Sequence, residues 1–448
     1  MSFYLMRKSI LKRYWSSRER YDLQQSSFLN DNKTVLFYSL IVFVVVLLAR
    51  SWANFTHPGL YVEDTSHYFN YFYGDFRGLE GLLNSPNGYY NIFTNGVGLL
   101  VAKLDVRIQP TIYLFVSVSM TVVTVMALSC SGLIRNKYLL FICPLLLGLS
   151  GANHLYYYIT LTYLIYVLVI LLFCLLFWEA GNSIWKSILL FLFLSLLVWS
   201  GPYSVLVIPF ALLFVFLFRG KTTMLIGLVI VAFCYLLSVT EKTIMLMNIF
   251  DPMILEVWSE TLLLKVFLME SREHITPKIL VILGSFFVLT ISIFRKDYFY
   301  LKVALLLFAL INGPLALLFL SKKYLLYQRV APCHLFLPQF FWLFFLLFTA
   351  DRFLSKSRSL KHLGLVFSFC FVAFVVFDNK QNLDQWTAPV MTTMERYLDT
   401  VHEHEQYHWE NENKVKVITT PGKRTLRPTV WVGKHSDESA EIESIHVE

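Results

Sequence analysis

The sequence predicts an all-α polytopic membrane protein with about eleven transmembrane helices and a small extracytoplasmic α+β domain at its C-terminal end. The first observation is compositional. Of the 448 residues, 56% are hydrophobic and only 15% are charged, and the mean hydropathy is +0.58, whereas a soluble domain carries about 25% charged residues. The second observation is that long apolar stretches alternate with short basic loops.

The apolar stretches define the predicted bundle, residues 34–377, because a spanning helix needs roughly 20 mostly apolar residues. The stretches at 138–151 and 187–201 are short and need tilting or extension to cross. The predicted spans are 34–51, 110–133, 138–151, 155–178, 187–201, 203–218, 223–240, 278–294, 300–320, 331–349 and 363–377.

The basic residues orient the bundle, since Lys and Arg accumulate in cytoplasmic loops. The N-terminal segment 1–33 is basic, and its basic region is too long for a signal peptide, so we expect a cytoplasmic N-terminus and a retained first helix. The net charge of +8 therefore indicates topology and no nucleic acid partner. Further cations in the predicted inner loops are Arg135, Lys137, Lys186, Arg219, Lys221, Arg295, Lys296, Arg352, Lys356, Arg358 and Lys361.

The predicted outer segments are 52–109, 241–277, 321–330 and the tail 378–448. In the tail we expect a helix around Thr392–Trp409, followed by alternating strands at 414–418 and 429–432 that flank a Pro-Gly turn. The acidic end from Ser436 has the composition of a disordered segment. All six cysteines lie in apolar stretches and form no metal-binding or disulfide pattern.

An acidic pair, Glu63-Asp64, opens a Tyr- and Phe-rich segment of the first outer loop that also contains His67 and Tyr68. A carboxylate at the outer mouth of a membrane bundle can act as a general base toward a sugar hydroxyl. The alternative is structural, because Asp64 followed by Thr65 can also cap a helix.

A cationic group on the outer side, Lys322, Lys323 and Arg329 with Tyr327 nearby, runs against the topology rule. Guanidinium and ammonium groups suit a phosphate or pyrophosphate head group. The alternative is that these long side chains snorkel at a helix end. Arg77 in the first outer loop is a weaker candidate of the same kind.

Two further motifs contain histidine. Asn153-His154 lies at an outer turn, next to tyrosines that suit the membrane interface. His404 to His408 matches H-E-x-x-H, but the metzincin extension fails at Asn411 and Lys414, and the remaining tail is short for a protease. We therefore predict no metal site from this motif. No nucleotide-binding motif is present.

The arrangement resembles the GT-C class of membrane glycosyltransferases, especially the bacterial branch that uses polyprenyl-phosphate sugars. Glu63-Asp64 matches the acidic motif of that class, 65–83 and 90–104 match its juxtamembrane helices, and 378–448 matches its outer domain. The resemblance covers the whole chain as architecture and only these few residues as motif.

The resemblance implies an inverting displacement in the bacterial inner membrane, with the C-terminus in the periplasm. Asp64 or Glu63 would be the base, and Arg329 with Lys322 or Lys323 would hold the donor phosphate. Substrate contacts are expected from His67, Tyr68, Arg77, Asn153, His154 and Tyr327. The partners would be a polyprenyl-phosphate-linked sugar donor, a glycolipid or glycan acceptor and membrane lipid. Some members of the class use a divalent metal and others do not, so the cofactor stays open.

Two alternative functions are left open by the sequence. A lipid-linked polysaccharide polymerase or ligase shares the substrates but concentrates basic residues in larger outer loops. A non-enzymatic flippase or transporter requires ionisable residues in mid-span, and the predicted spans are almost free of charge.

Overall fold

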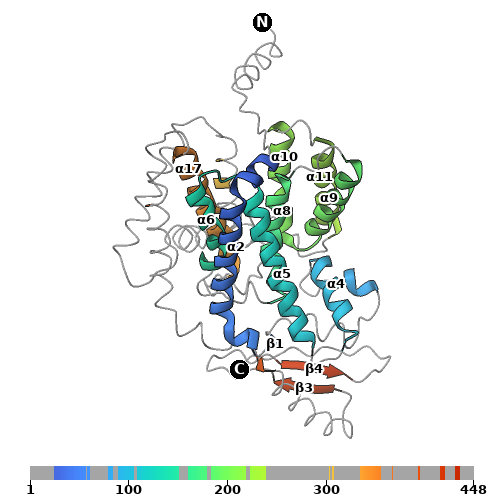
Figure 1. Cartoon of the computed structure of the whole chain (residues 1–448). Helices are drawn as coiled ribbons and strands as arrows, with labels where there is room; N and C mark the ends of the chain where they lie inside the picture. The colour runs from blue at the N-terminus through green and yellow to red at the C-terminus, as the bar shows by residue number, and fades with distance from the viewer. Residues whose placement is uncertain are drawn as a thin grey trace, which may run out of the picture.

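The protein is a helical membrane protein (Figure 1). The computed structural model describes residues 25–56, 58–60, 79–83, 89–104, 108–150, 160–178, 183–217, 222–238, 302, 305–306, 333–354, 366, 392–393, 414–418 and 429–433. Within this part of the chain, three helices are long and apolar enough to cross a membrane, and their spanning windows are Asn32–Ala49, Gln109–Cys130 and Phe336–Leu354.

The first three helices of the bundle are α2 and the hairpin of α5 and α6. Helix α2, Gln25–Thr56, and helix α5, Gln109–Cys130, each cross the bundle. A tight turn after α5 leads into α6, Lys137–Ser150, which runs beside α2 in the same direction. The Ser39 hydroxyl of α2 donates a hydrogen bond of 2.7 Å to the Phe141 carbonyl of α6, and this contact fixes the register of the two helices.

The central helices are shorter and more apolar. They are α8 (Leu164–Leu176), α9 (Ile184–Val198), the 3-10 helix η4 (Pro202–Leu206), α10 (Val207–Leu217) and α11 (Thr222–Ser238). The last long helix, α17, Cys333–Leu354, packs against α6 and α8.

The predicted spans up to 223–240, and the later one at 331–349, each contain a helix, and three of these helices are long enough to cross a membrane. The span 155–178 is wrong at residues 160–163, which are not helical, since α8 begins at Leu164. The prediction is wrong at the start of 203–218, because Pro202 opens a 3-10 turn and the α-helix begins only at Val207. The spans 278–294, 300–320 and 363–377 lie outside the described residues, except that Lys302, Leu305, Leu306 and Val366 are helical.

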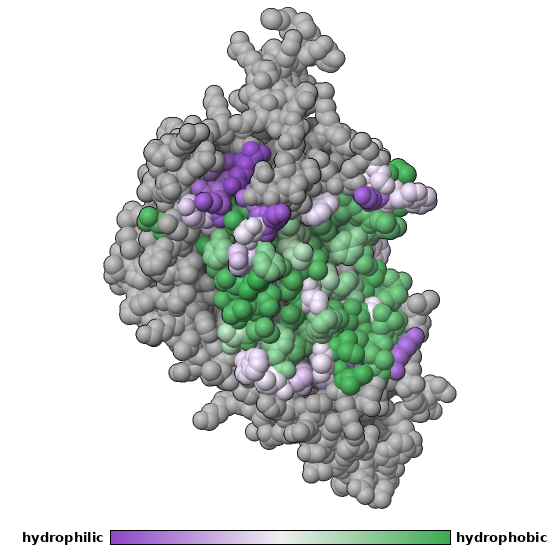
Figure 2. All heavy atoms as spheres, in the orientation of Figure 1, coloured by the Kyte–Doolittle hydropathy of each residue, from purple (hydrophilic) through white to green (hydrophobic). Residues whose placement is uncertain are grey.

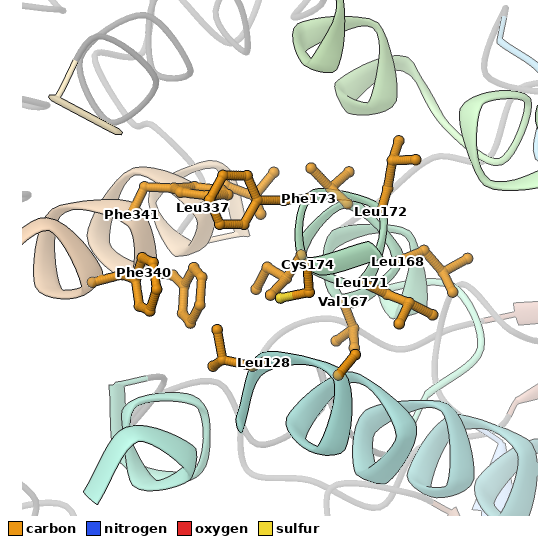
Figure 3. Close-up of a cluster of buried hydrophobic side chains, with 14 of the residues drawn as sticks. Leu128, Val167, Leu168, Leu171, Leu172, Phe173, Cys174, Leu337, Phe340 and Phe341 are labelled. Carbon is orange, nitrogen blue, oxygen red and sulfur yellow. The ribbon is translucent and has the colours of Figure 1, made fainter. Parts of the chain in front are cut away.

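Helix α8 occupies the centre of the core (Figure 3). Phe173 on α8 meets Phe341 of α17, Phe210 of α10 and Phe177 edge-on, with ring centroids 5.2, 5.5 and 5.2 Å apart. Figure 3 shows Leu128 of α5 pointing toward the space between α8 and Phe340 of α17. Interdigitated aromatic and aliphatic side chains thus join α5, α8, α10 and α17.

Short strands lie at one end of the bundle (Figure 1). Strands β3 (Lys414–Ile418) and β4 (Thr429–Gly433) pair antiparallel at the positions that the sequence predicts. The predicted helix around Thr392–Trp409 is wrong at its start, because Thr392–Thr393 form strand β2 and pair with β1, Gly59–Leu60. The main-chain groups of Gly59 and Leu60 provide the pairing edge, and residues 394–413 lie outside the described residues.

The opposite end is closed by a charged group that we call the clasp: Asp351 and Arg352 of α17 with the α5–α6 turn. The Asp351 carboxylate accepts hydrogen bonds from the backbone N–H groups of Arg135 (2.9 Å) and Asn136 (2.6 Å). The Arg352 guanidinium donates to the Leu133 carbonyl at 2.7 Å and lies over the Phe348 ring. Arg352 thus lies at the end of a helix and is buried, whereas the sequence predicted it in a loop.

The two ends of the bundle are therefore chemically distinct. The clasp end carries the charged groups described above, and the other end, which we call the α4 end, carries the strands and helix α4, Ile92–Val101. Figure 2 shows a broad hydrophobic band across the described surface between hydrophilic residues.

We predict that Asp351→Ala destabilises the protein by about 3–5 kcal/mol. The substitution leaves the Arg352 charge buried without its neighbouring carboxylate, which lies 3.7 Å away, and removes the acceptor for the Arg135 and Asn136 N–H groups. Thermal unfolding in detergent measures the loss.

The matched control is the double variant Asp351→Asn with Arg352→Gln, which removes both charges and keeps an acceptor oxygen. It should lose clearly less stability, because removing both buried charges leaves neither one uncompensated. An unfolding temperature for Asp351→Ala equal to that of the wild type would contradict a stabilising clasp.

Candidate functional site

The α4 end carries the starts of α8 and α17, the turn between α9 and α10, and the end of α11. Helix α4 itself contacts η3 (Leu79–Leu83), α5 and α9. The turn itself docks the beginning of α4. The Ile92 N–H donates to the Trp199 carbonyl at 3.1 Å, and the Phe93 N–H donates to the Ser200 hydroxyl at 3.1 Å. Free N–H groups in the first turn of a helix need such partners, so α4 is fixed to the bundle at its N-terminus.

An aromatic cluster strengthens this attachment. The rings of Tyr90 and Trp199 stack at 5.8 Å, and Tyr235 of α11 meets both rings edge-on, at 6.3 and 5.7 Å. The Tyr235 hydroxyl donates to the Tyr90 carbonyl, and the Tyr90 hydroxyl donates to the Ser238 carbonyl, both at 3.3 Å. The chain before α4 is thereby tied to both α9 and α11.

Gly201 allows the close approach of α4 to the turn. Its φ of 145° lies in a region that is essentially restricted to glycine. A Cβ atom here would lie 3.4 Å from the Asn91 side-chain oxygen and 3.4 Å from the Cβ of Ile165. The glycine thus serves both the backbone conformation and the close packing of the turn between Asn91 and Ile165 of α8.

A buried tyrosine pair joins the starts of α8, η4 and α17. The hydroxyls of Tyr166 and Tyr203 lie 3.3 Å apart, and their ring centroids lie 4.9 Å apart. Phe336 of α17 meets the Tyr166 ring edge-on at 6.2 Å. The first turns of three elements that are distant in sequence are therefore held together at the α4 end.

The buried polar side chains identified at this end are uncharged, in contrast to those of the clasp. The Asn95 amide donates to the Leu82 carbonyl of η3, Leu79–Leu83, at 3.1 Å. Other members are Thr94, Gln109, Thr160, Thr162, Ser200 and Ser204. Several of their hydroxyls donate to main-chain carbonyls: Thr94 to Asn91 at 3.2 Å, Ser200 to Leu196 at 2.6 Å and Ser204 to Leu197 at 2.9 Å.

All the site residues predicted from the sequence lie outside the described residues. They are Glu63, Asp64, His67, Tyr68, Arg77, Asn153, His154, Lys322, Lys323, Tyr327 and Arg329. The described residues that border their segments do lie at the α4 end. Leu60 of β1 and Leu79 of η3 border the first segment, Thr160 follows the second, and α17 follows the third.

The lengths of chain between these borders and the predicted residues are short. In the sequence, Glu63 follows Leu60 by three residues, His154 precedes Thr160 by six, and Arg329 precedes Cys333 by four.

No group of three or more His, Cys, Asp or Glu side chains that could hold a metal ion occurs among the described residues. His404 and His408 lie outside them, so the H-E-x-x-H match stays a sequence observation. The cofactor remains open.

The sequence analysis missed the docking surface of α4. A signal for it is present in Trp199-Ser200-Gly201-Pro202, where an aromatic residue, a hydroxyl and a Gly-Pro pair interrupt an apolar run. The partners of this turn, Tyr90 and Tyr235, are distant in sequence and carry no local signal.

Comparison with known proteins gives no match: no family model fits the sequence, and no curated protein or solved structure is similar to the chain.

We predict that Gly201→Ala destabilises the α4 end by about 1–3 kcal/mol, because the backbone conformation at this position is strained for any residue with a Cβ atom. Hydrogen exchange of residues 92–101 should increase, since the same turn supplies the acceptors for Ile92 and Phe93.

Gly96→Ala is the matched control on α4 itself. A Cβ atom at Gly96 meets only Leu82, at an ordinary contact distance of 3.5 Å, and Ala favours the helix by about 1 kcal/mol over Gly. This variant should be as stable as the wild type or slightly more so. Equal exchange rates in the two variants would show that the turn does not hold α4.

Proposed function

We propose that this protein is a membrane glycosyltransferase that moves a sugar from a polyprenyl-phosphate donor to a glycolipid, surface polysaccharide or other extracytoplasmic acceptor by inverting displacement. The observation that carries the proposal is the convergence at the α4 end. The borders of the acidic segment, the Asn153-His154 turn and the cationic segment all lie there, beside a docked helix α4 and an uncharged polar layer.

The pairing of β1 with β2 adds a second support. Gly59 lies opposite Thr393, and Leu60 lies opposite Thr392, so the first loop and the beginning of the tail share one side of the bundle. That pairing agrees with a tail, 378–448, that forms an extracytoplasmic domain. It also agrees with about eleven spans and a cytoplasmic N-terminus. Paired strands on one side of the membrane are separated by an even number of crossings, and the first span adds one more, so the two ends of the chain lie on opposite sides.

In the proposed reaction, Asp64, with Glu63 as helper or as the base itself, accepts the proton of an acceptor hydroxyl. That oxygen attacks the anomeric carbon of the donor from the face opposite the phosphate. The bond between this carbon and the phosphate oxygen breaks, and polyprenyl phosphate leaves with the electron pair, held by Arg329 with Lys322 or Lys323. His67, Tyr68, Arg77, Asn153, His154 and Tyr327 would contact the sugar and the head group.

The proposed setting is the bacterial inner membrane, with the α4 end on the periplasmic side and the clasp end on the cytoplasmic side. Two basic residues, Arg135 and Lys137, lie at the clasp end. Lys186 lies in the first turn of α9, which runs from the clasp end to the α4 end. This distribution agrees with the positive-inside rule.

We predict that Asp64→Asn abolishes sugar transfer while the protein remains folded. Asn keeps the size and the hydrogen-bonding capacity of Asp but cannot accept the proton, and loss of a general base costs about 10²–10⁴ in rate. The measurement is transfer from a polyprenyl-phosphate sugar by the purified protein in lipid, together with the glycan profile of cells that carry the variant.

Asn caps a helix as well as Asp does, so a purely structural role for Asp64 predicts normal activity in this variant. Glu63→Gln, run in parallel, assigns the base between the two neighbours. Wild-type activity in both single variants and in the double variant would exclude the proposed mechanism.

We predict that the N-terminus is cytoplasmic and the tail extracytoplasmic. Alkaline phosphatase fused after Lys33 should be inactive, and the same enzyme fused after Lys380 should be active, because it folds only outside the cytoplasm. An inactive fusion at Lys380 would remove the placement of Glu63-Asp64 on the outer side.

A further inference from the structure

We propose that helix α4 lies in the hydrocarbon layer of the membrane, where it fills the depth that α9 and α11 leave uncovered and presents Leu100 and Leu104 to lipid chains. This inference rests on the membrane-spanning character of the bundle and is independent of the proposed enzymatic activity.

Helix α4 has its polar side chains on the protein side and apolar side chains outside. Thr94 and Asn95 are 0% and 5% exposed, whereas Leu100 is 67% exposed. The helix, Ile92–Val101, contains no charged side chain. A helix that lies at the water interface keeps a polar or charged face toward water. In α4 that face is missing, because both polar side chains are buried and donate hydrogen bonds to main-chain carbonyls.

The helices next to α4 are short for a membrane span. Helix α9 has 15 residues and α11 has 17, which give lengths of about 22 and 25 Å at 1.5 Å per residue. The hydrocarbon layer is about 30 Å thick, so roughly 5–8 Å stays uncovered along each helix. A helix with its side chains is about 10 Å across. The chain at the start of α4 docks at the ends of α9 and α11, so this one helix supplies the missing depth.

The contacts at this junction satisfy main-chain groups that would otherwise need water. The last carbonyls of a helix have no partner inside it, and in hydrocarbon the partner must come from the protein. The Trp199 carbonyl after α9 accepts a hydrogen bond from the Ile92 N–H at 3.1 Å. The Ser238 carbonyl, the last of α11, accepts from the Tyr90 hydroxyl at 3.3 Å. Further carbonyls in the last turn of α9 accept from serine hydroxyls, as a setting without water requires.

The lipid-facing surface of α9 and α11 continues onto α4. Helix α4 contacts the membrane-spanning α5 and lies below α9 and α11 in Figure 1. Leu189 of α9 and Ile230 of α11 are 65% and 57% exposed, and Leu104, four residues after Leu100, is 44% exposed. Lys103 is exposed beside them, and a lysine side chain can reach the head groups from the edge of the hydrocarbon.

In this position α4 makes the first outer segment, 52–109, re-entrant: the segment enters the membrane and returns to the side from which it came. A helix of ten residues is about 15 Å long and cannot cross, so the predicted number of spans is unchanged. Lipid chains then reach the α4 end of the bundle along α4 itself.

The test attaches bimane to the thiol of Leu100→Cys in a Cys234→Ala background, which lacks the exposed cysteine of α11. The full chain is labelled in detergent and placed in nanodiscs, and the background variant alone measures the signal of the other native cysteines. Lipids brominated on their acyl chains quench a label in hydrocarbon, and aqueous iodide quenches a label in water. We expect brominated lipid to remove most of the fluorescence added by Leu100→Cys, and iodide to leave it unchanged.

Two further positions provide matched controls. A label at Lys103→Cys, three residues along the chain, should be quenched by iodide, since we place Lys103 at the head groups. A label at Leu189→Cys, on the exposed face of α9, should be quenched by brominated lipid. Leu104→Cys repeats the test if Leu100→Cys does not fold.

Quenching of the label at residue 100 by iodide, to the extent seen at residue 103, would overturn the proposal, because it would place α4 in water. Quenching by neither agent would also overturn it, because it would show that protein, such as a second copy of the chain, covers this face.

Discussion

The complete burial of α8 is the constraint on which the rest of the bundle depends. Every side chain from Leu164 to Cys174 is at most 4% exposed, so this helix meets protein on all sides. In a membrane such burial gains little from the hydrophobic effect, because lipid chains are as apolar as leucine, and association depends on close packing and hydrogen bonds. The ring contacts of Phe173 with α10 and α17 supply that packing. Where α8 lies thus determines where α5, α10 and α17 can lie, and α2, on the outside, is free to face lipid.

Helix α17 is fixed at both of its ends by different chemistry. At the α4 end, Phe336 packs on Tyr166, and at the clasp end, Asp351 caps the start of α6 through the Arg135 and Asn136 N–H groups. Its spanning window is 78% buried, against 17% for α2. Helix α17, which contains Pro338, therefore links the clasp to the α4 end, and the two sets of contacts hold one element from opposite ends.

The sequence predicts the parts of the fold that depend on local hydropathy and fails where a distant partner decides. Apolar length alone is enough to place α2, α5 and α11, and alternation places β3 and β4. It does not place the α10 start, where Gly201 and Pro202 impose a turn inside an apolar run. It does not identify β2, since Thr392 is extended through pairing with Leu60, nor the burial of Arg352, which depends on the Leu133 carbonyl. For the candidate site, the sequence predicts the reactive residues, and the structure contributes the elements that border them.

The two borders of the acidic segment differ in strength. The β1–β2 pairing has two residues on each strand, and at about 1 kcal/mol for each hydrogen bond it is a weak attachment. The other border is stronger, because η3 is bonded to α4 through Asn95, and α4 is held by the turn at Ser200 and by the stacked rings of Tyr90 and Trp199. A catalytic carboxylate has to be held within about 0.5 Å of its productive position. Glu63 follows Leu60 by three residues and precedes Leu79 by sixteen. A base at Glu63 or Asp64 would therefore depend first on the weak pairing of β1 with β2, and only then on the docking of α4, a helix that carries none of the proposed reacting groups.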